Sequence, residues 1–202
     1  MSGFVIEPHA QLQSVNLYGA DLRHANLSNA NLEGANLERA NLEGANLRDA
    51  NLERANLSYA SLFRVTLNFA NLKGASLTAA DLFKALLYHA NLESAILACA
   101  EFECANLQGA NLNRADLESA NLRGAKLEGA NLQDANLEGA NLQDANLGGA
   151  NFEGANLRGA NLTASSLNVA KLNSADLTGA NLTGATMPNG ITYSHGSLNL
   201  FT

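Results

Sequence analysis

The chain has 202 residues, with 19 acidic against 12 basic side chains and only two cysteines. It has no apolar run long enough to cross a membrane and no segment that resembles a signal peptide, so we expect a cytoplasmic protein without membrane contact. The net charge is −7, and we expect no direct binding of nucleic acid.

The first nine residues, MSGFVIEPH, precede a five-residue repeat. Glu7 stands where that repeat would need Leu, so we place the boundary after His9. Repeat arrays expose apolar ends and unpaired strand edges. We therefore expect residues 1–9 to form an N-terminal cap, with Phe4, Val5 and Ile6 folded over the start of the array.

Residues 10–189 form 36 consecutive five-residue units without an insertion. Five residues rotate about 500° on an α-helix, so a period of five defines no helical stripe. On extended backbone the first and third residues, such as Ala105 and Leu107, point to the same side. The first residue of the next unit, Ala110, follows Leu107 by three residues. Because three is an odd number, an uninterrupted strand would point Ala110 to the opposite side. The chain must therefore turn a corner at Gln108 and Gly109, the fourth and fifth positions of the unit.

Glycine supports these corners, because 13 of the 17 glycines occupy the fifth position. A type II turn needs positive φ at its third residue, which Gly adopts without steric cost. Other corners carry residues such as Asp, Arg or Ser. Those corners have either another turn geometry or a strained positive φ.

The inward positions are nearly uniform. The third residue is Leu in 33 units, and the exceptions are Phe102, Phe152 and Met187. The first residue is Ala in 33 units, which predicts a filled apolar interior. Asn occupies the second position in 21 units, where stacked amides are expected to hydrogen-bond along the array as a structural ladder.

The pattern of Ala, Asn or Asp, Leu and two variable residues resembles the pentapeptide repeat family, which is abundant in cyanobacteria. The resemblance implies an all-β fold, a right-handed quadrilateral parallel β-helix with four units in each coil. Residues 10–189 would then form one solenoid of about nine coils, a rod about 43 Å long at about 4.8 Å per coil.

Residues 190–202 leave the repeat register after Met187. Pro188-Asn189-Gly190 predicts a turn that ends the array. The tail then alternates Ile191, Tyr193 and His195 before Leu198, Leu200 and Phe201. Two interpretations remain open for it, a short extended or hairpin cap over the last coil and a dimerisation surface.

The polar residues form no recognisable reaction centre. The four histidines are scattered outside any nucleophile, metal or phosphate motif, and we expect no enzyme, no cofactor and no metal. Cys99 and Cys104 fall at successive corners of one coil. That separation exceeds the limit of about 7 Å between bridged Cα atoms, so we expect free thiols.

Two functional hypotheses follow from the resemblance. Some members of the family mimic duplex DNA, bind type II topoisomerases and confer quinolone resistance. Duplex DNA of this length carries about 25 charges, whereas the outward residues here sum to −1, −3, −2 and 0 on the four sides. We therefore favour a protein-binding scaffold or regulator with an unknown protein partner or a homodimer, and keep topoisomerase inhibition or protection as the alternative.

Outward aromatic residues concentrate in one short stretch. Twenty residues per coil would place Phe63 and Phe83 in one column and Phe69 beside His89. We take six residues as the candidate protein contact: Tyr59, Phe63, Phe69, Phe83, Leu86 and Tyr88. They form either a ladder that stiffens its own coils or an interface, with Arg64 and Lys84 at its edge.

Overall fold

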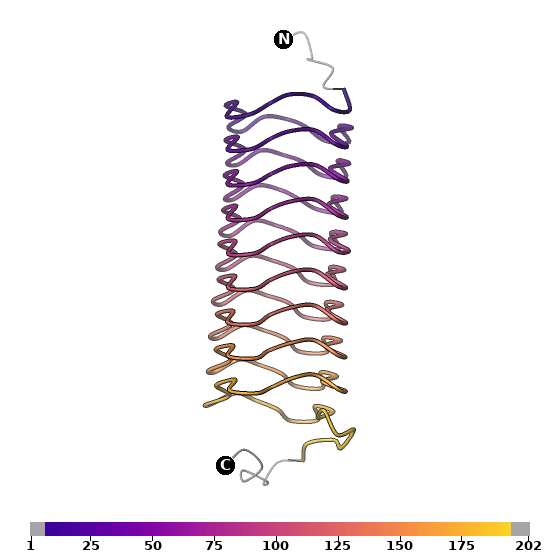
Figure 1. Cartoon of the computed structure of the whole chain (residues 1–202), viewed down its shortest axis with the longest axis vertical. Coiled ribbons are helices and arrows are strands. Elements are labelled where there is room, and N and C mark those ends of the chain that lie inside the picture. The colour runs from indigo at the N-terminus through magenta and orange to yellow at the C-terminus, as the bar shows by residue number, and fades with distance from the viewer. Residues whose placement is uncertain (1–6, 195–202) are drawn as a thin grey trace.

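The computed structural model describes residues 7–194, which wind into one regular solenoid (Figure 1). Each second-position residue pairs in parallel with the residue 20 positions later, from Gln11 with Asn31 to Ser166 with Thr186. Four units therefore make one coil, as expected. The strands are single bridged residues rather than longer elements, and no helix occurs between residues 7 and 194.

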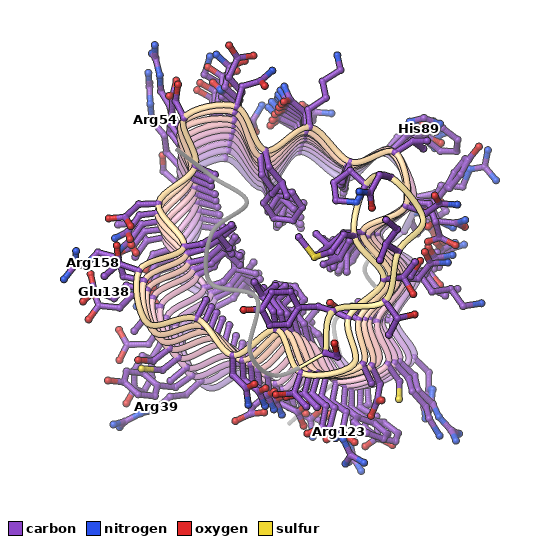
Figure 2. The ribbon with its side chains drawn as sticks, turned by 90° about the horizontal axis from the view of Figure 1, so that it is seen from below. Arg39, Arg54, His89, Arg123, Glu138 and Arg158 are labelled. Carbon is purple, nitrogen blue, oxygen red and sulfur yellow. The ribbon has the colours of Figure 1, made fainter. Side chains whose placement is uncertain are left out.

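The four sides of the solenoid are named here by the units that build them. The first side begins with Ala10, the second with Val15, the third with Ala20 and the fourth with Ala25, and each recurs every 20 residues. Viewed along the axis, the coils superimpose as a square with polar side chains outside (Figure 2). Within the described residues, no helix meets the length and hydropathy that a membrane span requires.

Backbone hydrogen bonds join each coil to its neighbours. The second, third and fifth amides of a unit donate to carbonyls of adjacent coils, as Leu32 does to Asn51 at 2.7 Å. The first amide closes the corner onto the preceding Leu, as Ala35 does onto Leu32 at 3.0 Å. Only the fourth amide lacks a backbone acceptor in this scheme, so it must find a side chain or water.

The second-position side chain supplies that acceptor. The Oδ1 atom of Asn91 accepts the amide N–H of Glu93 at 3.2 Å, and every second-position Asn and Asp makes the equivalent bond. The Nδ2 atom of Asn91 donates to Asn71 one coil earlier at 3.1 Å. On the first side this ladder is unbroken from Asn31 to Asn151. The predicted ladder is confirmed, and the capping bond is an addition to it.

All corners share one conformation. Every fifth-position residue from Ser14 to Gly184 has positive φ, between 50° and 73°, whether or not it is glycine. Of the two geometries left open for corners without glycine, positive φ is therefore the one adopted. It costs an L-residue about 1 kcal/mol or more, and the turn and inter-coil hydrogen bonds on either side offset this cost.

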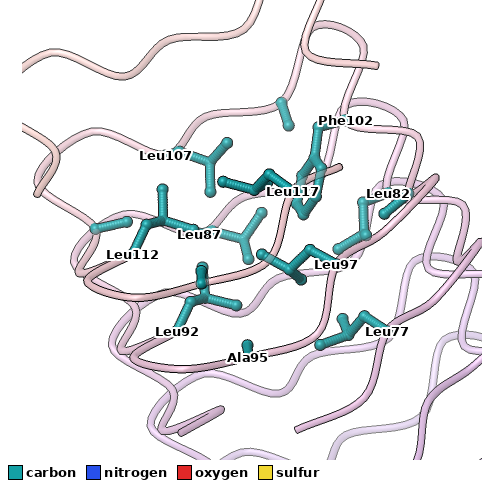
Figure 3. Close-up of a cluster of buried hydrophobic side chains, with 14 of the residues drawn as sticks. Leu77, Leu82, Leu87, Leu92, Ala95, Leu97, Phe102, Leu107, Leu112 and Leu117 are labelled. Carbon is teal, nitrogen blue, oxygen red and sulfur yellow. The ribbon is translucent and has the colours of Figure 1, made fainter. Parts of the chain in front are cut away.

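The interior is closely filled. First- and third-position residues from Leu27 to Leu167 are at most 1% exposed, including the larger Phe102 and Phe152. Their side chains interdigitate from all four sides toward the axis (Figure 3). Ser165 replaces a first-position Ala, and its hydroxyl donates to the Leu162 carbonyl at 2.8 Å. The buried hydroxyl therefore has a partner.

Corner hydrogen bonds extend to the N-terminal end of the described residues. Ala10 donates its amide to the Glu7 carbonyl at 3.3 Å, and His9 donates to Ser28 at 2.9 Å, which is the bonding pattern of a corner. A corner needs these hydrogen bonds and not an inward Leu, so they are compatible with an N-terminal cap over residues 1–9, and the boundary after His9 stays a prediction. Phe4, Val5 and Ile6 lie outside the described residues, so their predicted packing stays a prediction.

At the other end the chain reverses. Gly190 donates to Met187 at 2.8 Å, and Thr192 then pairs antiparallel with Thr186. Residues 184–193 therefore form a short hairpin at the last coil. His195, Leu198, Leu200 and Phe201 lie outside the described residues, and the choice between cap and dimerisation surface stays a prediction for them.

We predict that Asn91→Ala lowers the free energy of unfolding by about 1–3 kcal/mol, because it removes the acceptor for Glu93 and two links of the ladder. Asn91→Asp keeps the acceptor oxygen and should lose less. Chemical unfolding monitored by circular dichroism measures both variants. An Asn91→Ala protein as stable as the parent would contradict the capping role.

We predict that Val169→Gly raises the free energy of unfolding by about 0.5–1 kcal/mol, because φ of 50° strains a β-branched residue. Val169 is 70% exposed, so little apolar burial is lost. Asn29→Gly is the matched control at another corner of the same side, and it should change little because Asn tolerates this conformation. Equal shifts in the thermal midpoints of the two variants would refute corner strain.

Candidate protein-contact surface

The outward pattern changes in the middle of the rod. On the first side Asn71 and Asn91 continue the ladder. On the other three sides the second position carries no Asn between residues 61 and 101. The replacements are Ser61, Thr66, Ser76, Asp81, Leu86, Ile96 and Glu101. The same stretch holds several exposed large apolar side chains, so composition and surface change together here.

Two phenylalanines stack on the third side. The ring centroids of Phe63 and Phe83 lie 5.7 Å apart with planes only 8° from parallel, and both side chains are half-buried. Arg64 lies over the Phe63 ring at 5.1 Å, and Lys84 over the Phe83 ring at 5.0 Å. The sequence placed these cations at the edge of the candidate contact. Their positions over the rings add detail to that prediction, and we name these four residues the stacked-Phe cluster.

A second aromatic group occupies the far corner of the fourth side. Phe69 and His89 stack at 5.9 Å, and Tyr88 packs edge-on against both, at 5.6 Å from Phe69 and 4.2 Å from His89. Arg48 lies 5.4 Å from the Phe69 ring centre. Figure 2 shows His89 projecting from this corner. We name these four residues the corner cluster.

Leu86 lies on the fourth side between the two clusters and replaces a capping Asn. It cannot accept the amide N–H of Tyr88, and Asn68 from the preceding coil accepts it instead at 2.9 Å. The lost cap is therefore compensated by a neighbour in the same column. Leu86 remains 41% exposed.

Tyr59 does not join the other five candidate residues. It lies at the corner between the second and third sides, with Arg39 5.8 Å from its ring centre. Arg39 also donates to the Tyr18 hydroxyl at 2.9 Å. Within residues 7–194 no ring contact connects Tyr59 to the two clusters. We therefore define the aromatic patch as Phe63, Phe69, Phe83, Leu86 and Tyr88.

Sequence reasoning missed the roles of Asn68, Arg48, Arg64 and Lys84. Asn68 and Tyr88 occupy the same column 20 residues apart, so the 20-residue period of the coil could have predicted that they lie next to each other. The ring contacts of the cations depend on side-chain rotamers, which no sequence period encodes.

In the part of the chain that is described, the cysteines and other titratable groups form no compact site. Cys99 and Cys104 are exposed, unbridged and at successive corners. Among residues 7–194, no group of three or more His, Cys, Asp or Glu side chains is arranged to hold a metal ion. Neither a metal centre nor a thiol pair is therefore assembled in the part of the chain that is described.

A cavity of about 800 Å³ opens at the C-terminal end, lined by residues that include Leu172, Asp176, Leu177 and Pro188. Within residues 7–194, no further coil covers the inward side chains of the last coil at this end. The side-chain hydrogen bond from Thr178 lowers the pKa of Asp176. The lowered pKa therefore follows from hydrogen bonding of the Asp176 carboxylate.

Another pKa shift occurs at the exposed N-terminal part of the third side. The Arg23 side chain hydrogen-bonds to Asp21 and lowers the pKa of that carboxyl to about 2. Asp21 and Arg23 form an exposed ion pair at 2.7 Å, far along the chain from the aromatic patch. The shift is therefore the result of a surface ion pair.

Comparison with known proteins places the repeat in a family. The family model for pentapeptide repeats matches in eight copies, covering residues 9–44, 35–62, 60–98, 100–139, 135–168 and 150–189. No curated protein matches the chain.

Three solved structures illustrate the similarity. HetL, a pentapeptide repeat protein involved in heterocyst differentiation regulation in Nostoc sp. strain PCC 7120, is 35% identical over 95% of each chain, with a TM-score of 0.45. A trypsin-treated variant of QnrB1, a plasmid-mediated fluoroquinolone resistance protein, is 22% identical over 87% of this chain and 91% of its own, with a TM-score of 0.58. A thylakoid-lumen protein of Arabidopsis thaliana is 39% identical over 44% of this chain and 62% of its own, with a TM-score of 0.43.

The likeness to QnrB1 concerns the fold alone. The family match, in contrast, extends over nearly the whole described chain, and its units coincide with the observed corners and inward residues. The chain therefore belongs to the pentapeptide repeat family and has its right-handed quadrilateral β-helix.

Proposed function

We propose that this protein is a non-enzymatic scaffold or regulator that binds another protein, or a second copy of itself, through the aromatic patch. One observation carries the proposal: the polar ladder is interrupted on three sides in the coils that also expose the aromatic side chains. Contiguous apolar surface of this kind is typical of interaction sites, whereas single exposed apolar residues are ordinary.

Side-chain exposure supports an interface over a purely structural ladder. Stacking of Phe63 on Phe83 contributes about 0.5–1.5 kcal/mol beyond burial, which accounts for a half-buried pair. Phe69, Leu86 and Tyr88 remain 40% to 44% exposed. These three side chains still have apolar area to bury against a partner.

The proposal includes the absence of catalysis and a cytoplasmic location. Catalysis is best served by a concave and partly dry pocket, whereas the patch lies on the convex outside of a filled rod. The two unbridged thiols suit a reducing compartment.

Mimicry of DNA is the weaker candidate. The second side has the most acidic outward residues, yet Arg158 pairs there with Asp176 at 3.3 Å. Ion pairs of this kind interrupt a continuous line of negative charge, and such a line is what a mimic of a phosphate backbone requires.

We predict that Phe63→Ser with Phe83→Ser abolishes partner capture and self-association while leaving the thermal midpoint near that of the parent, because both rings face outward. Quantitative pull-down from extract of the native host measures capture, and light scattering after gel filtration measures self-association. A second variant, Leu86→Asn with Tyr88→Gln, copies Asn106 and Gln108 from the next coil and should have the same effect.

Ile96→Asn is the matched control, since it removes an exposed apolar side chain from the second side, outside the patch. It should leave binding unchanged. If the Phe63 and Phe83 variant loses substantial thermal stability while binding survives, the patch is a structural ladder and the proposal is wrong.

A further inference from the structure

The cations of the stacked-Phe cluster differ from most others on the rod. Most of the 12 Lys and Arg side chains lie within 4.0 Å of a carboxylate. Arg64 and Lys84 do not pair with any carboxylate between residues 7 and 194. They are exposed and lie over phenylalanine rings instead.

These two positive charges also lie in neighbouring coils. Arg64 and Lys84 occupy the same corner in successive coils, whose backbones lie about 4.8 Å apart. The column continues with Gly44 on one side and Cys104 on the other, both uncharged. On the adjoining fourth side, the outward residues of these two coils before the far corner are Thr66, Asn68, Leu86 and Tyr88. None of them is Lys, Arg, Asp or Glu. On the third side itself, Asp81 lies in the same unit as Lys84, and Glu43 and Glu103 continue the column of Phe63 and Phe83 in the coils on either side. The two unpaired cations at this corner therefore border an uncharged part of the fourth side.

We infer that Arg64 and Lys84 receive carboxylate side chains from an acidic, apolar segment of the partner protein. This inference rests on the proposed function, because the aromatic patch would bind the apolar side chains of the same segment. A guanidinium and an ammonium in one column suit two acidic residues beside Leu or Phe. Charge complementarity of this kind sets specificity and the association rate.

A protein segment suits this surface better than nucleic acid. Affinity for a polyphosphate chain grows with the number of phosphates neutralised, and this corner offers two cations. The net charge of −7 repels the rest of such a chain. A short acidic peptide needs only the local site and the apolar surface beside it.

Fluorescence anisotropy with defined probes tests the inference. Three pools of short labelled peptides share alternating Leu or Phe and differ only in the intervening residues, which are Asp or Glu, Asn or Gln, and Lys or Arg. A single-stranded oligonucleotide of equal length is the fourth probe. The parent protein should bind the acidic pool about tenfold more tightly than the amide pool.

Arg64→Gln with Lys84→Gln keeps the aromatic rings and should weaken binding of the acidic pool about tenfold, to the level of the amide pool. The matched control, Lys126→Gln with Lys171→Gln, changes the net charge equally at two unpaired cations outside the patch and should have little effect. Raising the salt concentration should reduce the difference between the acidic and amide pools.

Several results would overturn the inference: equal binding of the acidic and amide pools, preference for the basic pool, tighter binding of the oligonucleotide, no binding of any pool, or an acidic preference that survives loss of both cations. The proposed function can fail separately. Equal binding of acidic and amide pools that is lost in the Phe63→Ser, Phe83→Ser variant would leave the patch as a contact surface and remove only its charge specificity.

Discussion

The hydrogen bond from the fourth-position amide to the second-position side chain completes the backbone of this solenoid. Every other amide in a unit donates to an adjacent coil or closes a corner, as seen at Leu32 and Ala35. The fourth amide faces outward and depends on Asn or Asp two residues earlier, as Glu93 depends on Asn91. The side-chain amides of these Asn residues also hydrogen-bond from coil to coil and form the ladder. One type of side chain therefore both caps the backbone and links the coils.

This dependence explains how the rod can change its surface locally without changing its fold. Core and corners continue unaltered through residues 61–104, although Asp81 is the one capping Asn or Asp at the second positions of three sides between residues 61 and 101. Where Leu86 replaces Asn, Asn68 caps the Tyr88 amide from the neighbouring coil. The outward positions are then available for aromatic and cationic side chains on a rigid support. Rigid support reduces the ordering cost of binding.

The five-residue period predicted most of the fold, because the odd step between Leu107 and Ala110 forces a corner whatever residues occupy it. The family resemblance added the four-sided coil, which placed Phe63 beside Phe83 and Phe69 beside His89, as observed. Tyr59 is near the patch in sequence but lies at the preceding corner of the square, so its part in a protein contact stays a prediction. The contacts of Arg64 and Lys84 depend on flexible side chains that a repeat pattern does not specify.

Amide hydrogen exchange resolved by residue tests the central claim most directly. The claim is that side-chain caps, and not burial alone, protect the fourth-position amides. It predicts slow exchange at Glu93 and Tyr88, which have acceptors, and fast exchange at Ala98 and Glu103, whose amides find no protein acceptor within residues 7–194. Equal protection of all four amides in these neighbouring coils would contradict it.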